Sequence, residues 1–178
     1  MIATIIIILT IILVLVLALK TGILRDPNSC SNPVQRNTYS LGRTQLMLWT
    51  TIVFCSYIYL VTKTDWQDIK FTESVALLLG ISAGTTVISR SIDKTSGVTQ
   101  KNSSGTDGCS KGFIIDILSD REGISVHRFQ QVIFTLLLVY VYLSGLIINK
   151  NFPDLDNYLL VLAGVSAGGY LGVKINEK

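Results

Sequence analysis

Five long apolar stretches, almost free of charged residues, constrain the fold of this chain more than any other feature. They run over Ile2–Leu19, Leu46–Val61, Ser74–Ser89, Val132–Ile148 and Tyr158–Val173. A transmembrane helix needs about 20 apolar residues, and flanking Arg, Lys, Tyr and Trp side chains can extend a shorter stretch into the headgroup region. Helices buried in a soluble bundle keep one polar face, and these stretches show none. We therefore expect an all-α integral membrane protein with about five transmembrane helices.

Charged residues make up 15% of the chain, whereas about a quarter is usual in soluble domains. Twelve Lys and Arg residues lie in the first and third connections between the stretches and in the tail, against three in the other two connections. Basic residues in short loops favour the cytoplasmic side. This bias predicts an inner-membrane protein with its N-terminus outside and its C-terminus in the cytoplasm. The net charge of +3 gives no global basic field, so we expect no direct binding to nucleic acid.

The first stretch is preceded only by Met1 and therefore lacks the basic segment that begins a cleaved signal peptide. We expect it to be a retained anchor helix, which either faces lipid or lines a path through the membrane.

The remaining four stretches contain an internal repeat. Ser40–Thr50 aligns with Ser125–Thr135, and Gly80–Gly84 aligns with Gly164–Gly168, at nearly the same spacing. Each unit has two crossings, so both units enter the membrane from the same side and form a parallel duplication. The expected organisation is an anchor (1–20), a linker (21–39), a first two-helix repeat (40–94), a linker with a short amphipathic helix (95–124) and a second two-helix repeat (125–178).

Polar residues recur at the start of each repeat. Ser40 and Ser125 occupy N-cap positions before an apolar run. The arginines that follow either anchor the helices to lipid phosphate, bond to the ends of neighbouring helices, or form a basic ring. The glutamines two residues further on are expected to lock the two helices of each unit together. The predicted cytoplasmic interface comprises Arg43, Gln45, Arg90, Arg128, Gln130 and Lys174.

Small residues recur four apart in both repeats, a spacing that lets membrane helices approach closely. The predicted helix-packing residues are Gly80, Gly84, Gly164, Gly168 and Gly172. The hydroxyls between and beside them could instead line a pore and replace part of the water shell of an ion. These candidate pore-lining residues are Ser82, Thr85, Thr86, Ser89 and Ser166.

Catalysis is not expected. The G-x-S-x-G strings match the nucleophile motif of serine hydrolases, but that motif needs a strand-to-helix turn and a partner base. Here it lies inside apolar helices, and the only histidine, His127, lies near the membrane surface. Acidic and basic residues are also absent from the centres of the stretches, which argues against a proton pump.

The connection between the third and fourth stretches has two parts. Lys94–Gly112 is rich in Ser, Thr, Gly and Lys and reads as a flexible linker. Phe113–Gly123 reads as a short amphipathic helix for the membrane surface or another subunit. Its expected apolar face comprises Phe113, Ile114, Ile117 and Leu118. Its acidic residues, Asp116, Asp120 and Glu122, are expected to be solvated rather than to bind a metal. The three cysteines, Cys30, Cys55 and Cys109, show no metal-ligand spacing, so we expect free thiols, no metal and no cofactor.

The LGRxQ string (41–45) and the GISAG string (80–84), set in a duplicated two-helix unit, resemble small bacterial multi-pass membrane proteins. Such proteins include membrane effectors of antiphage defence, which open pores under the control of a cytoplasmic protein or a nucleotide signal. The resemblance implies a pore-forming protein with a partner of that kind.

Two functions are compatible with the sequence. The first is a homo-oligomeric channel gated from the cytoplasmic side. It rests on the repeated small and hydroxyl-bearing faces, the lack of buried charge and the basic cytoplasmic rim. The alternative is a non-conducting membrane scaffold or sensor that recruits a cytoplasmic partner through residues 91–124.

Overall fold

The computed structural model describes residues 2–26, 36–64, 69–95, 109–119 and 123–176, and the regular elements in this part of the chain are all α-helices. The helices are α1 (Ile2–Lys20), α2 (Leu41–Val61), α3 (Glu73–Thr95), α4 (Phe113–Leu118), α5 (Val126–Asn149) and α6 (Asn157–Asn176). In the described residues, α1, α2, α3 and α5 are long and apolar enough to span a membrane. The chain is therefore a multi-pass membrane protein, and four of the five expected spans are candidates by length and composition.

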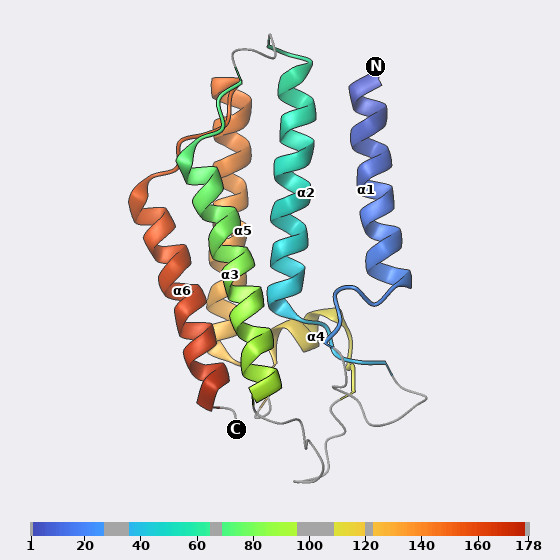
Figure 1. Ribbon diagram of the computed structural model, residues 1–178, viewed down its shortest axis with the longest axis vertical. Coiled ribbons are helices and arrows are strands. Elements are labelled where there is room, and N and C mark those ends of the chain that lie inside the picture. Colours follow the sequence, from blue (N-terminus) through green and yellow to red (C-terminus); the bar gives the residue numbers. More distant parts are fainter. Residues whose placement is uncertain (1, 27–35, 65–68, 96–108, 120–122, 177–178) are drawn as a thin grey trace.

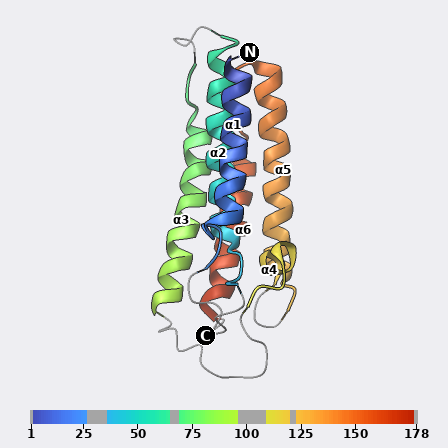
Figure 2. The same cartoon turned by 90° about the vertical axis from the view of Figure 1, so that its right-hand side faces the viewer.

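The five long helices lie side by side with alternating directions (Figure 1). Helices α2 and α5 run one way, and α1, α3 and α6 run the other. Helix α3 packs against both α2 and α6, and α5 packs against α6, so these four helices form a bundle. Helix α1 packs mainly on α2 and lies at the edge of the bundle in Figure 1, whereas the turned view in Figure 2 shows it in front of α2.

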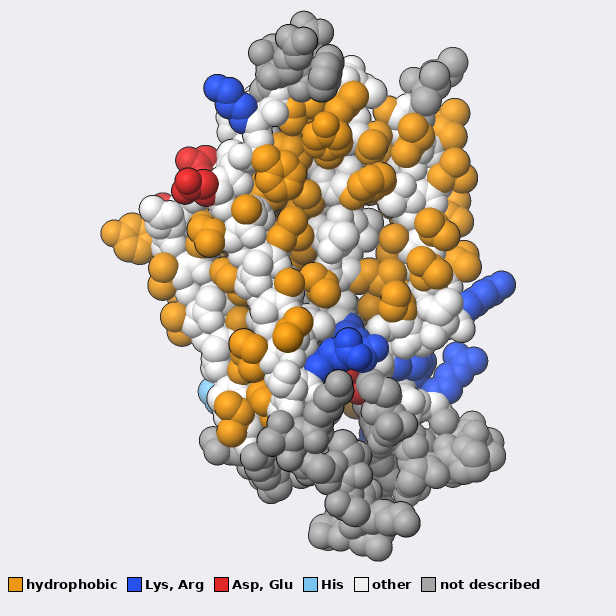
Figure 3. Space-filling view, viewed as in Figure 1, with side chains coloured by type: hydrophobic (Ala, Val, Ile, Leu, Met, Phe, Trp, Pro, Cys, Tyr) orange, Lys and Arg blue, Asp and Glu red, His pale blue; other side chains and the backbone are white. Residues whose placement is uncertain are grey.

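Charge separates the two ends of the molecule. The end that carries the α1–α2 connection, α4 and the C-terminus gathers most of the visible Lys and Arg side chains in Figure 3, and we call it the basic end. The end that carries the α2–α3 and α5–α6 connections includes Glu73, Asp154 and Asp156, and we call it the acidic end. Exposed apolar side chains cover much of the surface between them.

Two apolar clusters form the core. The larger cluster fills the part of the bundle nearer the acidic end, where the Trp49 and Tyr142 rings meet edge to face with centroids 6.0 Å apart. The smaller cluster, at the basic end, is formed by Leu41, Ile117 and Tyr170. Core packing therefore joins α2 to α5 in the larger cluster, and joins α2 to α4 and α6 in the smaller one.

The helix starts follow local sequence signals. Ser40 and Ser125 are the N-cap residues of α2 and α5, as predicted, with nearly identical backbone angles (φ −95° and ψ 124° or 126°). Neither serine side chain makes a capping hydrogen bond. At α6 the preceding Asp156 does, because its carboxylate accepts a hydrogen bond from the Tyr158 amide at 3.0 Å.

The acidic end is tied together by the start of α3 and the α5–α6 connection. The Ser74 hydroxyl donates to the Asp154 carboxylate at 2.6 Å, and the Thr72 hydroxyl donates to the Pro153 carbonyl at 3.0 Å. A Cβ atom added at Gly145 would lie 2.8 Å from the Pro153 Cβ, closer than side chains pack. Glycine at 145 therefore lets the connection fold back onto α5.

Several predictions for the third connection are wrong. The expected helix over Phe113–Gly123 ends at Leu118, and the chain turns so that the Ser125 amide donates to the Leu118 carbonyl at 2.8 Å. The expected apolar face is divided, because Ile117 is buried while Phe113 and Ile114 are exposed. In a one-and-a-half-turn helix packed on α5, only the side facing the bundle can be covered.

Candidate functional site

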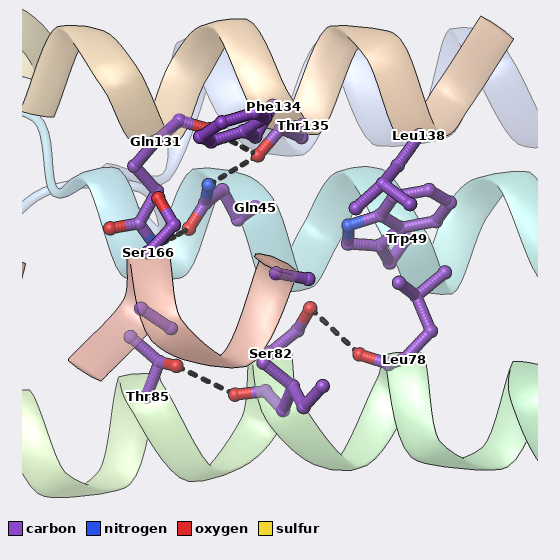
Figure 4. Close-up of a pocket in the computed structure, with 13 residues that line it drawn as sticks. Gln45, Trp49, Leu78, Ser82, Thr85, Gln131, Phe134, Thr135, Leu138 and Ser166 are labelled. Atoms are coloured by element: carbon purple, nitrogen blue, oxygen red, sulfur yellow. Dashed lines mark hydrogen bonds between the residues drawn. The ribbon is translucent and has the colours of Figure 1, made fainter. Parts of the chain in front are cut away.

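A polar layer separates the two apolar clusters. Side chains from α2, α3, α5 and α6 surround a cavity of about 30 Å³, enough for one or two water molecules (Figure 4). The lining residues are Gln45, Trp49, Leu78, Ile81, Ser82, Thr85, Gln131, Phe134, Thr135, Leu138, Ala163, Ser166 and Ala167. Each of the four bundle helices thus contributes to one small polar chamber.

A chain of side-chain hydrogen bonds joins α2 to α5 across this layer. The Gln131 amide donates to the Gln45 oxygen at 2.9 Å, and the Gln45 amide donates to the Thr135 hydroxyl at 2.6 Å. The Thr135 hydroxyl in turn donates to the backbone carbonyl of Gln131 at 2.8 Å. Polar bonds of this kind hold membrane helices together because lipid offers no alternative partners.

The α3 hydroxyls at the chamber are already used as donors. Ser82 donates to the Leu78 carbonyl at 3.0 Å, and Thr85 donates to the Ile81 carbonyl at 2.7 Å. Because a hydroxyl also carries two lone pairs, both oxygens stay available as acceptors beside the cavity.

Two buried oxygen atoms at the chamber have no hydrogen-bond partner. They are Oε1 of Gln131 and Oγ of Ser166, whose side chains are 5% and 7% exposed. An unsatisfied buried polar group costs about 1–3 kcal/mol. The chamber therefore contains polar groups that packing alone does not explain.

All five predicted pore-lining residues are buried inside the bundle. Ser82, Thr85 and Ser166 line the chamber. The other two lie nearer the basic end, where Thr86 donates to the Gly42 carbonyl at 3.0 Å and the Ser89 hydroxyl lies 3.4 Å from that of Tyr170. All five side chains therefore face the interior of the bundle rather than its outer surface.

The glutamine prediction needs correction. Gln45 does not bond within its own two-helix unit but reaches α5, and Gln130 is exposed. The buried partner is the neighbouring Gln131, which shares one face of α5 with Leu138 and Tyr142. Adjacent helix positions point about 100° apart, so only one of the two glutamines can face the bundle.

The predicted packing glycines make no close contact inside the chain. A Cβ atom added at Gly80, Gly84, Gly164, Gly168 or Gly172 would meet nothing within 4 Å. The close approach of α2 and α3 occurs instead at Gly42, where an added Cβ would lie 3.4 Å from the Thr86 hydroxyl. The repeat predicted packing at glycines in the centres of the helices, whereas Gly42 lies near the α2 N-terminus.

The two repeated arginines have different partners. The Arg43 guanidinium donates to the Ile23 carbonyl at 3.2 Å and lies 3.7 Å from the Asp26 carboxylate, so it binds the α1–α2 connection. The Arg128 guanidinium lies over the Tyr170 ring of α6, 5.4 Å from its centroid. Arg90 is exposed, and the Lys174 side chain lies outside the described part of the chain.

Asp116 organises the basic end. It is 7% exposed, so the prediction of a solvated side chain is wrong for this residue, while Asp120 and Glu122 lie outside the described residues. Its carboxylate accepts hydrogen bonds from the Tyr39 amide (3.2 Å), the Ser110 hydroxyl (2.6 Å) and the Lys111 amide (2.8 Å). We call this arrangement the Asp116 clamp. It ties the start of α2 to α4.

Cys109 lies beside the clamp. It forms an antiparallel bridge with Asn37 and is disulfide-bonded, so the prediction of free thiols is wrong for this residue. Cys55, within α2, is free. Cys30 lies outside the described residues.

Within the described residues, no group of three or more His, Cys, Asp or Glu side chains could hold a metal ion. Comparison of the chain with protein families, characterised proteins and solved structures finds no match. The chamber and the basic end are therefore the candidate functional features of the described residues.

Proposed function

We propose that this protein is a membrane channel in a closed state, with α6 as the fifth span and a conduction path through the polar chamber. The observation that carries the proposal is that four helices turn hydroxyl and amide groups inward around one cavity. Polar groups inside a membrane bundle are costly and usually functional. Hydroxyls and amide oxygens can replace part of a hydration shell, and apolar layers on either side can gate by excluding water.

The apolar clusters supply such layers here. Trp49 and Leu138 border the chamber and belong to the larger cluster, toward the acidic end. Toward the basic end, the smaller cluster includes Ile117, which lies on α4 next to Asp116. We infer that release of the Asp116 clamp moves α4 and loosens the smaller apolar cluster. The channel would then be gated from the basic end.

A homo-oligomer is part of the proposal. The glycines of α3 and α6 leave room for a neighbouring helix, because nothing in the same chain lies within 4 Å of a Cβ added there. Small-xxx-small faces of this kind let helices from different subunits approach closely. The pore-forming antiphage effectors suggested by the sequence resemblance would fit this arrangement.

The proposed orientation places the basic end in the cytoplasm, following the charge bias. The disulfide at Cys109 supports the opposite orientation, because disulfides persist mainly in oxidising compartments. Digestion of a C-terminal tag decides between them. We expect protease to remove the tag only after cells are permeabilised, and removal from intact cells would reverse the orientation.

Ion flux through purified protein in liposomes tests the channel itself. We expect flux to change when Thr85→Val removes a hydroxyl oxygen from the chamber. Thr50→Val is the matched control, because Thr50 also donates to its own helix (Leu46 carbonyl, 2.8 Å) but is exposed outside the bundle.

The gate is tested in the same assay. We expect Asp116→Asn to raise flux, because an amide cannot accept all three hydrogen bonds of the clamp. Empty liposomes give the background. If both the wild type and Asp116→Asn stay at this background, the conduction proposal fails.

A non-conducting scaffold or sensor is the second candidate. It is favoured by apolar side chains of α4 that remain uncovered, with Phe113, Ile114 and Ile115 exposed by 41%, 65% and 48%. Such a surface could recruit a protein partner, or a nucleotide-controlled one, at the basic end. An Ile114→Ser/Ile115→Ser variant should then lose a co-purifying partner, whereas a channel should keep its flux.

A further inference from the structure

The chamber contains two unpartnered oxygens that a single small ligand could satisfy. The amide nitrogen of Gln131 donates to Gln45, and this bond identifies the other atom of the amide as the oxygen Oε1. An amide oxygen can only accept a hydrogen bond. The Ser166 hydroxyl can both donate and accept. Both atoms are buried, and both side chains line the same cavity, as Figure 4 shows.

The size and chemistry of the cavity select the ligand. Its volume of about 30 Å³ excludes organic solutes but admits water. Buried waters usually make about three hydrogen bonds, and polar cavities of this size hold them. A water can donate to Gln131 Oε1, pair with the Ser166 hydroxyl, and donate to a lone pair of Ser82 or Thr85.

We propose that the chamber is an internal water site, with Ser166 and Gln131 as its two principal ligands. The bound water completes the hydrogen-bond chain from Gln45 and links α6 to α2 and α5. The chamber side-chain hydrogen bonds of Gln45, Ser82, Thr85 and Gln131 described above do not reach α6, so the water supplies the polar connection of that helix to the layer.

This site does not depend on conduction. A wet chamber in a protein that never conducts would overturn the proposed function and leave the water site standing. A dry chamber in a conducting protein would do the reverse. Flux measurements and water detection therefore test the two proposals separately.

X-ray radiolysis of the purified protein tests the water site, because bound water becomes hydroxyl radical and oxidises the side chains beside it. Leu78 and Leu60 form a matched pair, both in the larger core cluster and exposed by 2% and 0%. Of these two leucines, Leu78 lines the chamber and Leu60 does not. We expect several-fold greater oxidation of Leu78, read by mass spectrometry, and equal oxidation of the two leucines would overturn the proposal.

Variants at Ser166 identify the ligand. Ser166→Val removes the hydroxyl and fills space, and should lower Leu78 oxidation to the level of Leu60. Ser166→Thr keeps a hydroxyl and should preserve the difference. If Ser166→Val leaves Leu78 as reactive as in the wild type, Ser166 does not hold the water. The wild-type comparison decides the main question even where the valine variant folds poorly.

Discussion

Gln45 and Gln131 form the polar link between α2 and α5, and their energetic role depends on burial. The Gln131 amide donates a hydrogen bond to the Gln45 oxygen, so removing either side chain leaves a buried polar atom of the other without its partner. Hydrogen bonds between membrane helices contribute about 0.6 kcal/mol on average and up to about 1.7 kcal/mol. The cost of an orphaned partner adds to that value.

We expect Gln131→Leu to lower the free energy of unfolding by about 1–3 kcal/mol, because it leaves the Gln45 oxygen without its partner. Unfolding in increasing SDS measures this. The adjacent Gln130→Leu is the control and should change little, because Gln130 is exposed. Equal effects of the two variants would contradict the assigned register of α5.

A second prediction concerns Gly145 and its contact with Pro153. Gly145→Ala places a methyl group 2.8 Å from the Pro153 Cβ atom, so the α5–α6 connection must shift. Overpacking of this kind costs about 1–3 kcal/mol. Thermal unfolding in detergent should show a clear loss for Gly145→Ala and little change for Gly169→Ala, where nothing lies within 4 Å. Similar melting of both variants would argue against the folded-back connection.

At the scale of the elements, hydropathy predicted the long helices well and the short segments poorly. The apolar stretches correspond to α1, α2, α3, α5 and α6, although α2 starts five residues before its stretch. The short helix starting at Phe113 was predicted, but its end at Leu118 and the Asp116 clamp were not, because they depend on contacts between residues far apart in the chain. Tyr39 and Asp116, for example, are separated by 77 positions.

The residues of the chamber were also predicted only in part, because some of them depend on contacts between distant helices. Hydroxyl spacing identified Ser82 and Ser166, because their positions on one face of a helix can be predicted from the local sequence alone. Gln131 was missed because the repeat alignment paired Gln45 with Gln130. Buried positions at Leu138, Tyr142 and Leu146 lie on the same helical face as Gln131, and this periodicity was a usable signal.

The Asp116 clamp leads to a prediction for α4. We expect Asp116→Asn to speed amide hydrogen exchange in residues 36–40 and 109–119, because the carboxylate bonds that join these segments are lost. Exchange within α5 and α6 should stay close to wild type. Glu73→Gln, an exposed carboxylate at the acidic end, serves as control. Unchanged exchange at 36–40 would mean that Asp116 does not hold the basic end together.

At the scale of the whole molecule, the bundle buries the hydroxyls of the five candidate pore-lining residues, while its central glycines pack closely against nothing in the same chain. Polar groups that could line a path therefore belong to one subunit, while the small-residue faces remain open to lipid or to another copy. Assembly and conduction would then use different surfaces of the same two helices, α3 and α6.

Bulky substitutions test the assembly surface. We expect Gly84→Leu and Gly168→Leu to abolish the homo-oligomer without unfolding the chain, because an added Cβ meets nothing within it. Light scattering of the detergent-purified protein gives the subunit number. Ala76→Leu, at another exposed position of α3, should leave it unchanged. An oligomer of the same size in the glycine variants would remove these faces from the assembly proposal.

The pairing of Gln45 with α5 also has a consequence for biosynthesis. Its partners, Gln131 and Thr135, lie 86 and 90 residues further along the chain. At ordinary translation rates, α2 leaves the ribosome on the order of 5–20 s before them. During that interval its amide must enter the bilayer unpaired or stay beside the insertion machinery. Delayed release of α2, until α5 has been made, would let the polar layer form without exposing Gln45 to lipid.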